Sequence, residues 1–212
     1  MREEINILSI DFDWIMEPSI ALYNDLAADS VPCDETLSRA PGVTIKPDFE
    51  KFRLLNMYIN NIVHTIKDTS HVGYATHHEA IIDYIKNIWK LGDKRYNIYN
   101  IDHHHDCGYG VLTMQDIYDM KLQCGNWVPY CDKIKDYIWI NNKNSITNTI
   151  IPEVRQRFRK FQFTADINII NYVKFDYLFL CLSPGWVPKE YYPLYQVLEF
   201  NIDKIYEIMA AP

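Results

Sequence analysis

Short apolar segments with strand character alternate along this chain with longer segments of helical spacing, and this alternation restricts the fold more than any other feature. Strands are predicted over residues 5–10, 72–75, 96–101, 137–140 and 177–182. Helices are predicted over 49–67 with Asp48 as N-cap, over 77–89, and over 189–209 with an early bend at Pro193. Such alternation is typical of an α/β fold with a mainly parallel sheet.

Two segments have less regular patterns. Residues 27–47 contain several prolines and a glycine, and we expect a loop there. Residues 146–173 suggest an antiparallel pair of strands, at 146–151 and 159–164. The chain has no internal repeat and no linker, and its 212 residues are ordinary for one domain, so we expect a single α/β domain over residues 1–212.

Composition excludes several classes of protein. Apolar residues make up 48% and charged residues 23% of the chain, which excludes a disordered protein. The net charge of −7 argues against nucleic acid as a partner, because phosphate binding needs a basic face. No apolar run is long enough for a membrane span, and the charged N-terminus is not that of a signal peptide. Five cysteines without paired spacing predict a reduced, cytoplasmic protein, and nothing indicates an oligomeric state.

The strongest functional signal is a cluster of acids and histidines at residues 102–106, with the sequence Asp-His-His-His-Asp. It follows a predicted strand, and side chains alternate between the two faces of a strand, so Asp102, His104 and Asp106 should project to one side. Ligands of parallel α/β sheets bind beyond the carboxyl ends of the strands. A solvated, histidine-rich loop is the alternative interpretation.

Two further clusters also follow predicted strands. Asp11 and Asp13 share one side, where two like charges would force a proton onto one carboxyl unless a cation neutralised them, and a capping role is the alternative. Residues 76–79, Thr-His-His-Glu, open a predicted helix, and a surface histidine is the alternative there. Carboxylates with one or two imidazoles and no thiolate suit divalent ions such as manganese, and two such ions can deprotonate a shared water.

These motifs resemble those of the arginase (ureohydrolase) superfamily, which carries Asp-x-His-x-Asp, Ser-x-Asp-x-Asp-x-x-Asp-Pro and a single histidine after a strand. Residues 102–106 match the first motif, and residues 9–13 match the start of the second. The second motif departs at its end, where Met16 replaces an aspartate. His78, or alternatively His77, corresponds to the single histidine.

In the family the serine–aspartate motif comes last of the three, whereas here it opens the chain, which looks like a circular permutation. The resemblance implies a three-layer arginase-like fold and two Mn²⁺ ions that activate water to attack a guanidinium carbon. It implies these ligands: Asp11 and Asp102 for both ions, His78 and Asp106 for one, and Asp13 and His104 for the other. It also implies that Asp106 relays a proton to the leaving amine.

Departures from the family concern the substrate. The segment Ser-Gly-Asn-Leu-His-Gly, which contacts the free amino acid in arginases, corresponds here to residues 124–129, with Val128 in place of histidine. The guanidinium-binding glutamate has two candidates, Glu79 and Glu17. The short, aromatic-rich chain is similar to small arginase-related proteins that act on arginine within a peptide. The expected substrate is therefore an arginine-containing peptide, which is converted to an ornithine-containing peptide and urea.

Two alternative functions stay open. One is a hydrolase of free arginine, agmatine or another guanidino or amide compound. The other is a metal-binding or peptide-binding protein without turnover. Residues 183–186, Ser-Pro-Gly-Trp, favour a tight turn with a packed tryptophan, with pocket lining as the alternative, and Cys107 is expected to be a small buried residue and not a nucleophile.

Overall fold

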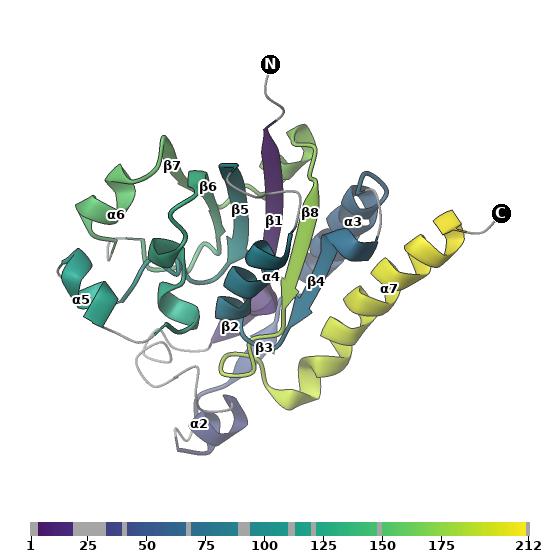
Figure 1. The fold of residues 1–212 in the computed structure, drawn as a ribbon. Coiled ribbons are helices and arrows are strands. Elements are labelled where there is room, and N and C mark those ends of the chain that lie inside the picture. Colours follow the sequence, from purple (N-terminus) through teal and green to yellow (C-terminus); the bar gives the residue numbers. More distant parts are fainter. Residues whose placement is uncertain are drawn as a thin grey trace.

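A six-stranded sheet forms the centre of the computed structural model, which describes residues 4–18, 33–39, 42–66, 69–88, 94–109, 113–119, 122–147 and 150–210 (Figure 1). Every neighbouring pair of its strands is parallel. The strands are, in spatial order, β4 (Val72–Ala75), β8 (Tyr177–Cys181), β1 (Ile5–Asp11), β5 (Tyr96–Asp102), β6 (Ile134–Asn141) and β7 (Lys160–Thr164). The predicted α/β fold with a mainly parallel sheet is confirmed.

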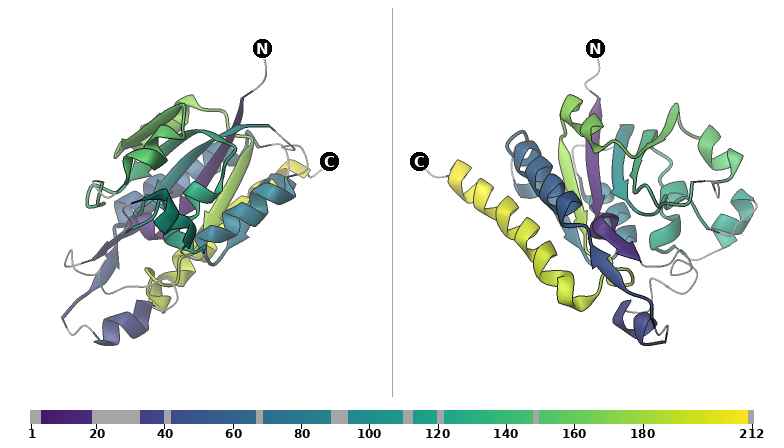
Figure 2. Two further views of the ribbon diagram at one scale, coloured as in Figure 1. Left: turned by 60° about the vertical axis from the view of Figure 1, so that its left-hand side comes forward. Right: turned by 180° about the vertical axis from the view of Figure 1, so that it is seen from behind.

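Helices cover both faces of this sheet, as Figure 2 shows in two further views. One face carries α3 (Phe49–Val63) and α7 (Tyr192–Ala210). The other carries α4 (Ile81–Asn87), α5 (Met114–Asp119) and α6 (Pro152–Gln156). Successive side chains of a strand point to opposite faces, so Ile7 belongs to the core under α4 and Leu8 to the core under α3. The result is a three-layer arrangement.

Shorter elements surround these layers. A second, antiparallel sheet pairs β2 (Met16–Pro18) with β3 (Ile45–Pro47), and α2 (Cys33–Arg39) lies between them in sequence. Short 3₁₀ helices are η1 (Phe12–Ile15), η2 (Thr69–His71), η3 (His78–Ala80), η4 (Cys124–Asn126), η5 (Val128–Tyr130), η6 (Ile167–Tyr172) and η7 (Lys189–Tyr191). The loop expected over 27–47 thus contains α2 and β3, while residues 27–32 and 40–41 lie outside the described residues.

The predicted helices are present with modified ends. Asp48 is the N-cap of α3, because its carboxylate accepts hydrogen bonds from the amides of Glu50 and Lys51. The helix expected from residue 189 is a 3₁₀ turn followed by α7. Pro193 is the second residue of α7, where a missing amide is not needed, so it starts the helix and does not bend it. Among the described helices, none combines the length and apolar character that a membrane span requires.

The predicted antiparallel pair near residues 146–164 is wrong. β7 is parallel to β6, with Asp136 opposite Lys160 and Ile140 opposite Thr164. The described part of residues 146–151 forms no strand. Parallel neighbours need a long crossover connection, and the chain between β6 and β7 supplies it through α6.

Candidate metal centre

All six residues predicted as metal ligands lie together beyond the carboxyl ends of β1, β4 and β5. They are Asp11, Asp13, His78, Asp102, His104 and Asp106. β1 ends at Asp11 and β5 at Asp102, while His78 begins η3 shortly after the end of β4 at Ala75. Five of the six are buried, and the His104 side chain is 13% exposed. Of the two neighbouring histidines, His78 is buried beside Asp11 and Asp102, whereas His77 is exposed.

Turns bring these side chains together. The expected alternation of side chains along a strand over residues 102–106 is not the cause. β5 ends at Asp102, and Asp106 has a left-handed backbone with a φ of 52°. The second pair converges similarly, since Asp13 lies in η1 and its amide donates to the Asp11 carboxylate at 3.2 Å. A left-handed non-glycine residue costs on the order of 1 kcal/mol or more, and such residues cluster at functional sites.

One group of ligands surrounds the imidazole of His78. Its Nδ1 lies 3.2 Å from Oδ2 of Asp11, 3.1 Å from Oδ2 of Asp102 and 3.0 Å from Oδ2 of Asp106. Despite these distances, Nδ1 forms no properly aligned hydrogen bond within the described residues. Three carboxylate oxygens thus lie close to one imidazole nitrogen without an aligned hydrogen bond. Ligands of a common cation have this arrangement.

A second group surrounds His104. Its Nδ1 lies 2.8 Å from Oδ2 of Asp13 and 3.8 Å from Oδ1 of Asp102. Oδ2 of Asp13 also lacks an aligned hydrogen bond among the described residues. In the sets Asp11–His78–Asp102 and Asp13–Asp102–His104, the candidate ligand atoms lie within 4.8 Å of one another, so each set could hold a metal ion. Asp102 belongs to both sets.

The electrostatics of the centre favour protons or a cation. Burial and the charge of Asp11 raise the pKa of Asp13 to about 8. Burial also raises the pKa of Asp102, where the charges of Asp106 and Asp11 add to it. Burial alone would lower the pKa of His104, but the neighbouring charge of Asp13 outweighs it and raises the pKa to about 10. A bound cation would replace these protons, because metals bind the deprotonated ligands.

Neighbouring side chains orient several of the ligands. Oγ of Ser9 lies 2.7 Å from Nε2 of His78, which leaves Nδ1 of that ring facing the carboxylates. Asn100 donates a hydrogen bond to Oδ2 of Asp102 at 3.0 Å. The buried indole of Trp127 donates to Oδ2 of Asp106. The sequence reasoning missed Asn100 and Trp127, although a polar residue two positions before Asp102 in an apolar strand was a signal for the former.

The turn after β8 also belongs to the centre. Ser183 has a φ of 53°, and its hydroxyl donates to Oδ2 of Asp11. The ring centroids of Trp186 and His104 are 4.2 Å apart. The predicted tight turn is present, and the turn also lines the centre. Cys107 is buried, and its Sγ contacts the carbonyl of His105 as expected for a packed thiol.

The remaining histidines of the cluster are structural. Burial lowers the pKa of His103 and of His105 to about 3, so both rings are neutral. His105 accepts a hydrogen bond from the amide of Cys107 at 3.0 Å and stacks on Tyr109. The alternative of a solvated, histidine-rich loop is therefore wrong.

The two candidate guanidinium-binding acids lie in different surroundings. Glu17 forms an ion pair with Lys51 at 2.8 Å and lies 3.9 Å from Lys143, so its charge is already matched. Glu79 follows His78 directly and accepts a hydrogen bond from the thiol of Cys124.

Comparisons with protein-family models, with curated proteins and with solved structures each found no match. The likeness of residues 9–13 and 102–106 to arginase motifs is therefore a resemblance in short motifs alone.

Proposed function

We propose that this protein is a dinuclear-metal hydrolase that converts arginine side chains of a peptide to ornithine and releases urea. The observation that carries the proposal is the convergence of six carboxylate and imidazole side chains, five of them buried, around two possible ligand sets that share Asp102. The match of residues 9–13 and 102–106 to arginase motifs supports it. A circular permutation is compatible with the sheet, because β1 lies at its centre between β8 and β5.

The ligand chemistry fits two manganese ions. The two ligand sets consist of oxygen and nitrogen donors, and such sets suit hard or borderline divalent ions. His78 and Asp106 would complete one site and Asp13 and His104 the other, with Asp102 and Asp11 common to both. When bound, a pair of such ions lowers the pKa of a shared water and so supplies a nucleophile at neutral pH.

Side chains of the protein direct the rest of the reaction. Addition of water to the guanidinium carbon and cleavage of its bond to the side-chain nitrogen give urea and the ornithine amine. Asp106 receives a proton from the water and delivers it to the departing nitrogen. The hydrogen bond from Trp127 holds the Asp106 carboxylate in place for this transfer. Glu79 is the acid proposed to receive the guanidinium group, since Glu17 is paired with Lys51.

Position 128 favours a peptide over free arginine. The side chain of Val128 is fully buried in the core under α4, and its amide donates to the carbonyl of Asp106 at 3.1 Å. A buried apolar side chain offers no contact to the charged amino and carboxylate groups of a free amino acid. In a peptide these two groups are uncharged amides, and such contacts are not required.

To test the proposal, purified protein and Mn²⁺ are incubated separately with an arginine-containing peptide, with free arginine and with agmatine. We expect the peptide to lose CN₂H₂ per converted arginine by mass spectrometry, with one urea released for each. Conversion of free arginine or agmatine alone would overturn the peptide assignment. If the protein binds metal but releases urea from none of the three compounds, it is a metal-binding protein and not an enzyme of this class.

A further inference from the structure

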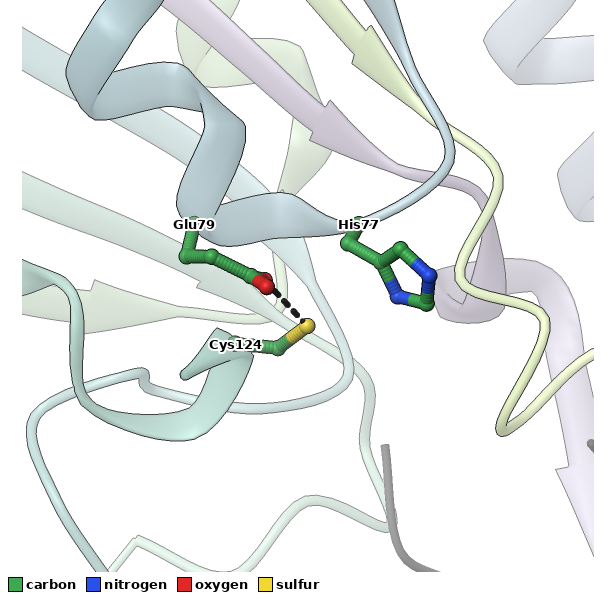
Figure 3. A group of neighbouring side chains, drawn as sticks. All are labelled: His77, Glu79 and Cys124. Carbon is green, nitrogen blue, oxygen red and sulfur yellow. Dashed lines mark hydrogen bonds between the residues drawn. The ribbon is translucent and has the colours of Figure 1, made fainter. Parts of the chain in front are cut away.

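A third group of side chains that could hold a metal ion lies outside the six-residue centre. Figure 3 shows its members, His77, Glu79 and Cys124, with the Glu79 carboxylate facing the Cys124 sulfur and the His77 ring beside them. Sγ of Cys124 donates to Oε2 of Glu79 at 2.6 Å. One candidate ligand atom from each of the three residues lies within 4.8 Å of the other two.

The fold builds this group from two segments that are far apart in sequence. His77 immediately precedes η3 and Glu79 lies within it, while Cys124 begins η4. Burial is graded, with Cys124 buried, Glu79 half-buried and His77 exposed, so the group is reachable from solvent on the His77 side. The His77 imidazole forms no capping hydrogen bond at the start of η3, although it stands at the N-cap position.

We propose that His77, Glu79 and Cys124 form a zinc site, distinct from the centre at Asp102. Thiolate, imidazole and carboxylate are the three ligand types of protein zinc sites, and three protein ligands leave a fourth position for solvent. The ligand set also selects against the metal of the centre, because a thiolate favours Zn²⁺ over Mn²⁺. The chain would thus bind Mn²⁺ through oxygen and nitrogen ligands at the centre, and Zn²⁺ at a second site that includes the sulfur of Cys124.

This site has a structural consequence for the centre. η3 begins with the ligand His78, and η4 leads into Trp127, which donates to Asp106. A zinc ion held by His77, Glu79 and Cys124 ties these two segments together. It also occupies the Glu79 carboxylate, so zinc and a guanidinium group exclude each other there. This last consequence rests on the proposed function, whereas the zinc site itself does not.

Cobalt substitution tests the site without any activity measurement. Co²⁺ bound to a thiolate gives an intense near-ultraviolet charge-transfer absorption, and none of the six residues of the centre carries sulfur. We expect this absorption when Co²⁺ is added to the wild-type protein, and its disappearance when Zn²⁺ is added in turn. Cys124→Ser should lose the absorption and bind one equivalent of Zn²⁺ fewer. Cys131→Ser is the matched control, since Cys131 is a buried free cysteine outside the group.

A second variant separates a three-ligand site from chance binding at one thiol. His77→Ala removes an exposed side chain, so the fold should persist, as circular dichroism would verify. We expect this variant to keep the sulfur absorption but to bind Co²⁺ more weakly. Absence of the absorption in the wild-type protein, its retention in Cys124→Ser, or unchanged Co²⁺ affinity in His77→Ala would each overturn the proposal.

Discussion

Asp102 is the residue that both ligand sets share, and its replacement is the most direct test of the centre. We expect Asp102→Ala to lower urea release more than about 100-fold, because residues that merely orient a ligand already contribute about 10- to 100-fold. The fold should persist, since the substitution removes one buried carboxyl from among like charges. Exposed Asp132→Ala is the control, and full activity in Asp102→Ala would contradict the assignment.

Within the described part of the chain, the side chain of Ser9 contacts the centre through His78, and Ser9 is not itself one of the proposed ligands. Ser9→Ala removes the partner of Nε2, so the ring loses the contact that fixes its orientation. We expect Mn²⁺ affinity to fall about 10- to 100-fold, as is usual for such supporting residues. Titration calorimetry measures the change. Ser38→Ala removes an exposed hydroxyl and should leave the affinity unchanged; equal affinity in both variants would rule out this role for Ser9.

Among the elements, the location of the sheet strands was predicted better than the direction of β7. β1, β5 and β8 are almost continuously buried, as interior strands of a parallel sheet are, and their apolar runs predicted them correctly. β7 lies at an edge, and its alternating sequence resembles that of a half-buried antiparallel strand. Its direction depends on the crossover through α6, which local periodicity does not encode.

The same distinction applies to the candidate site. The motifs predicted all six clustered residues because each motif is local and follows a strand. Trp127 and Cys124 could not be found in this way, since they reach Asp106 and Glu79 from a segment tens of residues away in sequence. Turns at Asp106 and Ser183 fix the final geometry, and a left-handed non-glycine residue leaves no recognisable pattern in one sequence.

The N-cap of α3 is a test at the scale of an element. Asp48→Ala removes the acceptor of two amides in the first turn, and such losses destabilise by about 1 kcal/mol. The Asp48 amide also donates to the carbonyl of Ile15 in η1, the turn that carries Asp13. We expect a lower free energy of unfolding in urea. Asp83→Ala, which removes an exposed ion pair with Lys86, should change the free energy of unfolding by less than about 0.5 kcal/mol, and a similar loss in both variants would contradict the capping role.

For the whole molecule, metal binding should release protons. Without metal, burial and the charge of Asp11 raise the pKa of Asp13 to about 8, and the charge of Asp13 raises the pKa of His104 to about 10, so this contacting pair holds a proton at neutral pH. The pair must lose that proton to bind a cation, so the affinity for Mn²⁺ should rise as the pH increases toward 8. Titration calorimetry in two buffers of different ionisation enthalpy would reveal the released protons. Identical heats in both buffers would show that the cluster binds metal without deprotonation.

Because the ligands come from three segments of the chain, a bound cation should stabilise the entire fold. Mn²⁺ at about 100 times its dissociation constant adds about 2.7 kcal/mol to the free energy of unfolding. For a chain of this length that corresponds to a rise in Tm of roughly 5–10 °C, at about 2–4 °C per kcal/mol. Protons compete for the same ligands, so at a fixed Mn²⁺ concentration the rise should be larger at pH 8 than at pH 6, given that the pKa of Asp13 is about 8. A chelator should reverse the rise in Tm, and the substitution Asp102→Ala should abolish it. An equal rise in Asp102→Ala would mean that the cation stabilises the protein from another place, because Asp102 belongs to both of the ligand sets Asp11–His78–Asp102 and Asp13–Asp102–His104.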